Sequence, residues 1–357
     1  MNRKTVLAAS IPALLAAPVQ AHVKWLHEPG LAALPPVAPF RLSDPVVLLG
    51  IELVCIALLA AAHFNRASET ATAARRLERL GRNHWSLLHR IVGLLLGMSL
   101  LRCAFDGALL APHLSGSGPV FEALRVVEAG SGLLFVAGTG MCAAAAALFV
   151  VCAGVLFLFG GVSFLEYAAL PGIAIFLSAS CLTHWRLHRL HRLVVMRVLL
   201  GVSLCTLAFT EKLLQPQMAV ELLAQYPFNF MQALGLEYPD RLFILSAGCA
   251  ELVFGLCFAL GLATRLNALA LAVFLVASNS YFFAAGNFQG ALLEASGHAP
   301  LFAALSALLL FGNGRIAMRR GFGALRHGGA AVRDRSLRLR RRPRSAAAAM
   351  QAPATAA

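Results

Sequence analysis

Charged side chains are scarce in this sequence. Of its 357 residues, 13% are Asp, Glu, Lys or Arg, whereas 59% are hydrophobic. Soluble proteins carry about 25% charged residues, because their surface has to be hydrated. This shortage argues against a soluble globular protein and favours a membrane protein. The charge that is present is mostly of one sign, since 30 basic residues stand against 16 acidic ones and give a net charge of +14.

Motifs for several kinds of chemistry are also missing. The eight cysteines show no CxxC spacing and all lie in apolar runs, so buried thiols are favoured over a metal cage or a disulfide framework. No nucleotide-binding loop and no catalytic triad is visible. A basic protein suggests a nucleic acid partner, but we expect none, because the basic residues gather beside apolar runs.

The first 21 residues have the pattern of a signal peptide. Arg3 and Lys4 precede a short apolar stretch, and small residues lead to a cleavage site after Ala21. An uncleaved first span is the alternative. Cleavage makes His22 the first mature residue and 22–44 an outer segment. The free amine and imidazole of His22 then form a chelating pair, which predicts a copper site there.

Nine apolar runs follow, most of them near the length of about 20 residues that a membrane span needs. We predict an all-α fold, a polytopic transmembrane bundle of about nine helices. The predicted spans are residues 45–63, 91–111, 123–140, 141–162, 166–183, 193–214, 242–263, 266–284 and 298–313.

The charges between these spans predict the orientation. Segment 64–90 has six arginines and two glutamates, 184–197 has four arginines and no acid, and the tail after 314 has eleven arginines and one acid. Nine spans place all three on one side, and basic residues mark the cytoplasmic side. We predict a multi-pass protein of the bacterial inner membrane, in contact with its lipids, with a periplasmic mature N-terminus. The Arg-rich residues 315–357 are expected to be a disordered cytoplasmic tail.

Two parts of the chain resemble each other. Residues Gly97, Ser99, Phe105 and Pro112 recur at an offset of 104 as Gly201, Ser203, Phe209 and Pro216. The pattern E-x3-G-x5-G begins at Glu128 and, at an offset of 123, again at Glu251. We therefore predict two parallel four-helix units. The expected parts are the helix 45–63, a basic loop 64–87, a first unit 88–184, a basic linker 185–192 and a second unit 193–314.

The second unit contains a series of ordered motifs: Arg197-Val-Leu-Leu-Gly201, Glu211-Lys212 with Pro216, Glu251-Leu-Val-Phe-Gly255, Gly261 with Arg265, and Gly312-Asn-Gly314. With these motifs it resembles the DoxX family of small four-helix membrane proteins. The first unit is a degenerate copy, in which the family's Arg falls at Gly93 and its Lys at Ala108.

The resemblance implies an accessory or quinone-interacting subunit of a membrane redox system, with a redox partner protein. The best-known relatives resemble subunits of a thiosulfate:quinone oxidoreductase. Whether this chain is itself an enzyme, as part of an oxidoreductase, stays open, and no cofactor is evident beyond the implied quinone. The alternatives are a transporter or permease for a small solute, and a membrane scaffold that recruits a periplasmic redox or copper partner.

Ionisable residues inside a bilayer are costly, which makes them candidates for function. They are Glu52, Arg102, Asp106, Glu128, Glu211, Lys212 and Glu251. Neighbours on a helix point about 100° apart, so Glu211 and Lys212 are not expected to face one partner together. Lys212 either extends outward or pairs with Glu251. Glu211, Lys212 and Glu251 predict a polar pocket for a quinone headgroup or a proton relay, and an ion pair that only fixes packing is the alternative.

Four further groups carry weaker signals. Arg102 and Asp106 stand four apart and can pair on one helix face, and Glu128 occupies the position of Glu251. We interpret this part as a mostly structural relic. His184, His188 and His191 share a helix face with arginines, which favours contact with anionic headgroups over haem or metal binding. Glu294 and His298 either extend the pocket or cap a helix.

Overall fold

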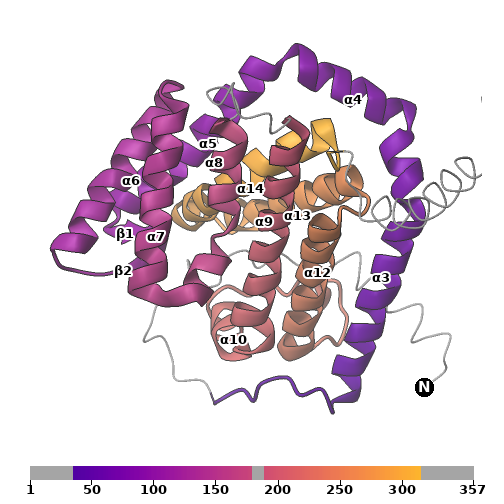
Figure 1. The fold of residues 1–357 in the computed structure, drawn as a ribbon. Helices are drawn as coiled ribbons and strands as arrows, with labels where there is room; N and C mark the ends of the chain where they lie inside the picture. The colour runs from indigo at the N-terminus through magenta and orange to yellow at the C-terminus, as the bar shows by residue number, and fades with distance from the viewer. Residues whose placement is uncertain (1–34, 179–188, 315–357) are drawn as a thin grey trace, which may run out of the picture. The chain divides into compact units, whose positions relative to one another are not determined.

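The computed structural model describes residues 35–178 and 189–314, and these residues form a helical bundle (Figure 1). The first unit contains α5 (Trp85–Phe105), α6 (Pro119–Ala137), α7 (Met141–Glu166) and α8 (Ala169–Leu177), and the second contains α9 (Arg189–Leu207), α12 (Asp240–Leu260), α13 (Thr264–Ala284) and α14 (Phe288–Phe311). The helix α3 (Pro45–Thr70) precedes both units. Each predicted span corresponds to one of these helices, which confirms the all-α bundle.

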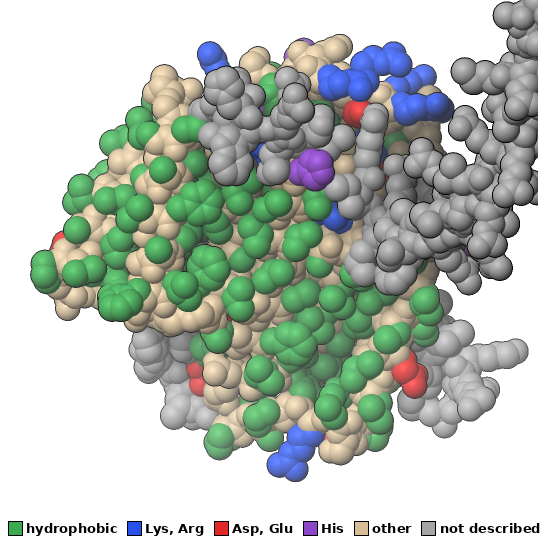
Figure 2. Space-filling model, in the orientation of Figure 1, with side chains coloured by type: hydrophobic (Ala, Val, Ile, Leu, Met, Phe, Trp, Pro, Cys, Tyr) green, Lys and Arg blue, Asp and Glu red, His purple; other side chains and the backbone are tan. Residues whose placement is uncertain are grey.

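Seven helices in the described part are long and apolar enough to cross a membrane: α3, α5, α7, the helix that begins with α9, α12, α13 and α14. The helix α6 carries Glu122, Arg125 and Glu128 within 19 residues, and α8 has nine residues. Apolar side chains cover the middle of the face that Figure 2 shows, and basic side chains gather beside α4. Such a surface is suited to a lipid environment.

Several boundaries differ from the sequence prediction, among them the start of α9 at Arg189, inside the predicted linker 185–192. The expected loop 64–87 is largely helical, because α3 continues to Thr70 and α4 (Thr72–Asn83) follows it. The span predicted to reach residue 111 ends at Phe105, and a hairpin of β1 (Ala108–Leu109) and β2 (Ala111–Ser115) comes next. The last span is longer than predicted, since α14 begins at Phe288.

The two units share a pattern of helix contacts. The first helix of each unit packs on the second helix of its own unit, as α5 does on α6 and α9 on α12. The first helix also packs on the last helix of the other unit, which pairs α5 with α14 and α9 with α8. The helix contacts of the two units are therefore reciprocal.

Close glycine contacts hold the first two helices of each unit together. A Cβ on Gly97 would lie 2.6 Å from the carbonyl oxygen of Gly132, and a Cβ on Gly201 would lie 2.5 Å from that of Gly255. Both distances are far below van der Waals contact, so the helices approach as closely as they do only because these residues lack side chains.

The turn after the second helix is also alike in the two units. Gly138 and Gly140 have positive φ angles of 69° and 61°, and their counterparts Gly261 and Ala263 have 71° and 42°. Ala263 is the exception, since a left-handed conformation is strained for a residue with a Cβ. Its amide donates to the Asn65 side chain of α3 at 2.9 Å, which helps to hold the turn.

Candidate functional site: a buried polar cluster

The predicted site residues Glu211 and Lys212 lie on a π-helical turn. The helix α9 continues into η2 (Ala208–Leu213), which widens the helix just before it ends. Both side chains are buried, with 0% and 1% of their surface exposed. Widened turns of this kind are frequent at functional sites. Sequence reasoning assumed a regular helix here and therefore expected the two side chains to diverge.

Lys212 joins the predicted site residues to one another. Its Nζ donates to Glu251 Oε2 of α12 at 2.8 Å and lies 3.8 Å from Glu211 Oε2. Of the two options for Lys212, pairing with Glu251 is the one that the structure has. The ammonium of Lys212 thus lies near both carboxylates.

Two residues of α14 extend this cluster. Glu294 accepts a hydrogen bond from Ser278 Oγ at 3.0 Å, and its Oε1 lies 3.6 Å from His298 Nε2. Glu294 also interacts electrostatically with both Glu211 and Lys212. Glu294 and His298 are 3% and 0% exposed. They therefore extend the polar cluster rather than cap a helix.

Asn279 completes the cluster from α13. Its Nδ2 lies 2.9 Å from His298 Nδ1 and donates to the carbonyl of Leu275 at 2.8 Å. Sequence reasoning missed Ser278 and Asn279, because uncharged polar residues in an apolar helix are common and give little signal. We call the following residues the outer cluster: Glu211, Lys212, Glu251, Ser278, Asn279, Glu294 and His298.

An aromatic segment lies beside the outer cluster. The chain between η2 and α12 folds into α10 (Pro216–Gln225) and the short α11 (Phe230–Ala233), and α10 packs on η2 and α12. Tyr226 and Phe228 contact Phe282 and Tyr281 of α13 with ring centroids 5.4 Å apart in each pair. We call these four residues the aromatic cap. Tyr281 and Phe282 follow Asn279 closely, so the cap adjoins the outer cluster.

Polar contacts fix the end of this segment. Buried Asn229 donates to Asp240 Oδ1 at 2.7 Å and to the carbonyl of Tyr238 at 2.9 Å. The hydroxyls of Tyr238 and Ser246 are hydrogen-bonded, and Ser246 donates to Leu242, so Tyr238 is the donor in that pair. Burial raises the pKa of Tyr238, which keeps its hydroxyl protonated at neutral pH.

The corresponding place in the first unit is built without a lysine. Glu128 is fully buried and accepts from the backbone amide of Leu110 at 3.0 and 3.2 Å. Leu110 has a φ of 60° and lies in the β1–β2 hairpin. Arg102 and Asp106 form the predicted pair, with Nε to Oδ2 at 2.6 Å. The interpretation of Glu128 as mostly structural is consistent with a purely backbone partner.

The first unit also holds a His–Glu pair that sequence reasoning did not single out. His113 Nε2 lies 3.9 Å from Glu166 Oε2, and the backbone carbonyl of Glu166 accepts from Ser203 Oγ of α9. Glu166 is buried, whereas the His113 side chain is 22% exposed. The pair therefore lies at the edge of the first unit rather than in its core.

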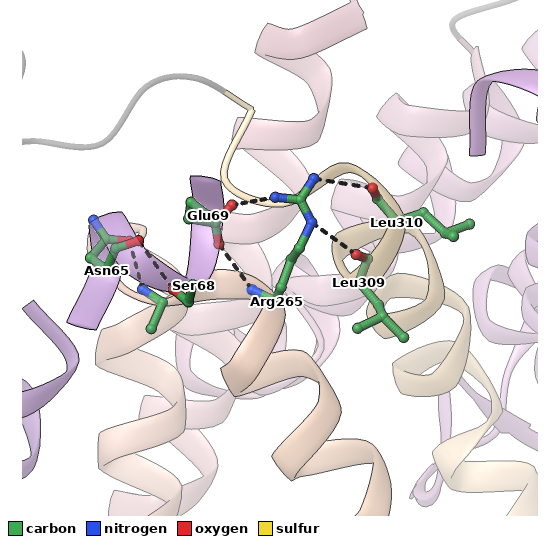
Figure 3. Close-up of polar contacts among 7 residues, drawn as sticks. Asn65, Ser68, Glu69, Arg265, Leu309 and Leu310 are labelled. Carbon is green, nitrogen blue, oxygen red and sulfur yellow. Dashed lines mark hydrogen bonds and ion pairs between the residues drawn. The ribbon is translucent and has the colours of Figure 1, made fainter. Parts of the chain in front are cut away.

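A second polar centre ties α3 to the second unit (Figure 3). Arg265 Nη1 and its backbone amide both donate to the Glu69 carboxylate, at 2.6 and 3.1 Å. Its other nitrogens donate to the last carbonyls of α14, those of Leu309 and Leu310, at 3.2 Å each. Arg265 therefore connects α3, α13 and the end of α14. We call this centre the α3 latch.

Other residues of the sequence motifs converge on the α3 latch. Arg197 interacts electrostatically with Glu69, and its guanidinium packs against Gly261 so closely that no side chain fits there. A Cβ on Gly312 would collide with Glu69 and Arg265. These glycines and arginines are thus explained by packing and charge around one carboxylate.

Several predicted residues lie outside the described part of the chain. These are the signal peptide, His22, His184, His188 and the tail. His191 is described and exposed. Within residues 35–178 and 189–314, no group of three or more His, Cys, Asp or Glu side chains could hold a metal ion.

The fold and its apolar helices define a polytopic helical membrane protein. Residues 192–286 match the DoxX family model, and they run from the end of the predicted linker through α13. The chain is thus similar to DoxX proteins over residues 192–286, and its apolar helices are those of an integral membrane protein. No curated protein and no solved structure matches the chain.

Proposed function

We propose that this protein is a quinone-interacting subunit of a membrane redox system and that the outer cluster is its site. The observation that carries the proposal is the charge balance of the cluster. Glu251 and Glu211 lie 2.8 and 3.8 Å from one ammonium, that of Lys212, and Glu294 interacts with it electrostatically. Lys212, Glu211 and Glu294 are at most 3% exposed, and Glu251 is 15% exposed.

Three ionised carboxylates beside one ammonium would leave a net negative charge in an apolar environment, which is very unfavourable. Charge balance therefore favours protons on two of the three carboxyl groups, with one carboxylate left to pair with Lys212. A buried group of protonated carboxyls next to a lysine and a histidine can store protons and pass them on. A quinone takes up two protons and two electrons when it becomes a quinol, so such a site suits this substrate.

The residues of the site suit both the carbonyl oxygens and the ring of a quinone. Lys212 and His298 have N–H groups of the kind that hydrogen-bond to carbonyl oxygens, and the aromatic cap offers ring faces for stacking. Glu294 connects to His298 and lies within electrostatic range of Lys212, so the proton-holding groups adjoin both donors. The electrons come from a partner redox protein, which the DoxX likeness of residues 192–286 suggests.

The proposal includes a location in the bacterial inner membrane with the outer cluster toward the periplasm. Exposed Arg75, Arg76, Arg79 and Arg82 of α4 lie at the end of α3 that holds the α3 latch. Basic residues favour the cytoplasmic side. The outer cluster adjoins α10 and the acidic segment before α12, which suits the opposite side.

The test of the proposed quinone site compares Glu251 with Glu128, which occupies the corresponding position in the first unit. Glu251→Gln removes the charged partner of Lys212, whereas Glu128→Gln keeps an oxygen that accepts from Leu110. Each variant is purified in mild detergent, matched for abundance, and labelled with a short-chain azido-benzoquinone. We expect Glu251→Gln to lower the labelling about tenfold or more, since hydrogen bonds to charged groups contribute about 1.5–3 kcal/mol. Glu128→Gln is expected to label like the unchanged protein.

Labelled peptides also locate the site. Under the proposal they come from the aromatic cap or from α14 near His298. In membranes with the native electron donor, Glu251→Gln should slow quinone reduction by a similar factor at unchanged abundance. Equal labelling of both variants, or label confined to the first unit, would remove the outer cluster from consideration as a quinone site.

A further inference from the structure

The helix α3 has a carboxyl group on its outward face. Glu52 is exposed and makes no hydrogen bond or ion pair with any described residue. It lies about 9 Å along the helix from Val46, at 1.5 Å per residue, and is thus within the apolar part of the span. Lipid tails offer no hydrogen-bonding partner at this depth.

The side chains around Glu52 form a continuous apolar face. Leu48, Ile56 and Leu59 are 50%, 60% and 71% exposed and stand at helical spacings from Glu52. The opposite face is the one that packs on α12, with Val47, Gly50 and Val54 buried. Of the seven candidate spans, α3 is the least buried. We call the surface formed by Leu48, Glu52, Ile56 and Leu59 the Glu52 face. It is turned away from the rest of the described chain.

We propose that the Glu52 face is a contact between two copies of this chain. Inside a bilayer a carboxyl group is far less costly when it is neutral. A neutral carboxyl has one donor and one acceptor, so it is complementary to a second carboxyl. Two copies in one membrane have the same orientation, and a twofold axis along the membrane normal brings residues of equal depth together. Glu52 of one copy then meets Glu52 of the other, and apolar side chains surround the pair.

A native cysteine makes this contact measurable. Cys55 is exposed and follows Glu52 by three residues on the same side of α3. Mild oxidation with copper phenanthroline in native membranes, followed by non-reducing electrophoresis, is expected to give a band of twice the chain's mass. A short bismaleimide should give the same product. Cys55→Ser should abolish both.

Two variants separate a specific contact from random collision. In the Cys55→Ser background, Leu133→Cys places a thiol on α6 at a position that is 60% exposed, and this thiol should not cross-link. Glu52→Leu, with Cys55 retained, is expected to lower the cross-linked fraction about tenfold, because it removes the interhelical hydrogen bond. Glu52→Gln should keep the cross-link, since an amide also pairs with itself.

Each other outcome overturns the proposal. No cross-link at Cys55 means that lipid covers the Glu52 face, and a cross-linked product of a different mass means that another protein does. Equal cross-linking at Leu133→Cys means that collision explains the result. Unchanged cross-linking in Glu52→Leu means that Glu52 does not hold the contact. Because Glu52 is not part of the outer cluster, quinone labelling is a separate measurement.

Discussion

The two four-helix units have a glutamate at corresponding positions, Glu128 and Glu251, and provide it with different hydrogen-bond partners. Glu128 of the first unit accepts hydrogen bonds from the backbone of a short hairpin. Glu251 of the second unit accepts a hydrogen bond from the Lys212 side chain, which also lies 3.8 Å from the carboxylate of Glu211. A backbone amide can only hold a carboxyl in place, whereas a lysine can also exchange protons. This difference is the reason why we place the proposed proton chemistry in the second unit.

The similarity beneath this difference extends to single hydrogen bonds. Ser131 of α6 donates to the carbonyl of Ala144 in α7, and at an offset of 123 Asn267 of α13 donates to the carbonyl of Phe254 in α12. The same two positions are joined, with the donor on opposite helices. Both units thus have a side-chain to backbone hydrogen bond between the same two positions, but different residues form it.

Lys212→Met tests the comparison most strongly. It leaves Glu251 and its neighbours without a cation, and removal of one partner of a buried ion pair costs about 3–5 kcal/mol. We expect the free energy of unfolding, measured with SDS in mixed micelles, to fall by this amount. Lys212→Met combined with Glu251→Gln should recover part of it. A loss below about 1 kcal/mol in the single variant would contradict the role of Lys212 as the centre of the cluster.

Glu69→Gln tests how much the contacts between Glu69 of α3 and the second unit stabilise the protein. The first unit has Cys142 and Gly93 at the positions of Arg265 and Arg197, so it has no equivalent cations. Loss of the Glu69 charge is expected to cost about 1.5–3 kcal/mol. Thermal unfolding in detergent measures it, with Glu78→Gln, whose partner Arg82 is exposed, as the control. If both variants melt alike, the α3 latch does not stabilise the protein.

The glycine contacts test whether the units are equivalent. Gly97→Ala and Gly201→Ala each force two helices apart, at an expected cost of about 1–3 kcal/mol. Gly130→Ala is the matched control on α6, because a Cβ there meets nothing within 4 Å. Unfolding of the three variants under the same conditions gives the comparison. Clearly unequal losses at Gly97 and Gly201 would argue against a shared helix-pair geometry.

Arg102→Gln should have the smallest effect. Its pair with Asp106 is about one-third exposed on each side, and exposed pairs spaced four residues apart contribute about 0.3–0.5 kcal/mol. We expect a shift in melting temperature close to the error of the measurement. A loss as large as that of Lys212→Met would mean that the first unit also depends on a buried charge.

Composition and periodicity predicted most of the helices, because an apolar run long enough to span a bilayer has few other structures available. The hairpin after α5 was missed since Ala108-Leu109-Leu110-Ala111 is as apolar as the helix before it, and hydropathy does not separate strand from helix. The helix α4 was taken as a loop, although arginines at 75, 76, 79 and 82 have helical spacing.

The candidate site was predictable where it is charged and not where it is neutral. Glu211, Lys212 and Glu251 stand out in apolar helices, and Glu294 and His298 were noted as a pair. Ser278 and Asn279 look like ordinary residues of a span until the structure places them beside those side chains. The partner of Glu69 is 196 residues away in the sequence, and no local pattern identifies it.

That separation has a consequence for how the protein is made. The helix α3 is synthesised before both four-helix units, but Arg265 and the carbonyls of Leu309 and Leu310 are among the last described parts of the bundle to leave the ribosome. At a translation rate of about 5–20 residues per second, Arg265 is synthesised roughly 10–40 seconds after Glu69. During that time α3 lacks its contact with Arg265, and the α3 latch is complete only when the last turn of α14 has been made.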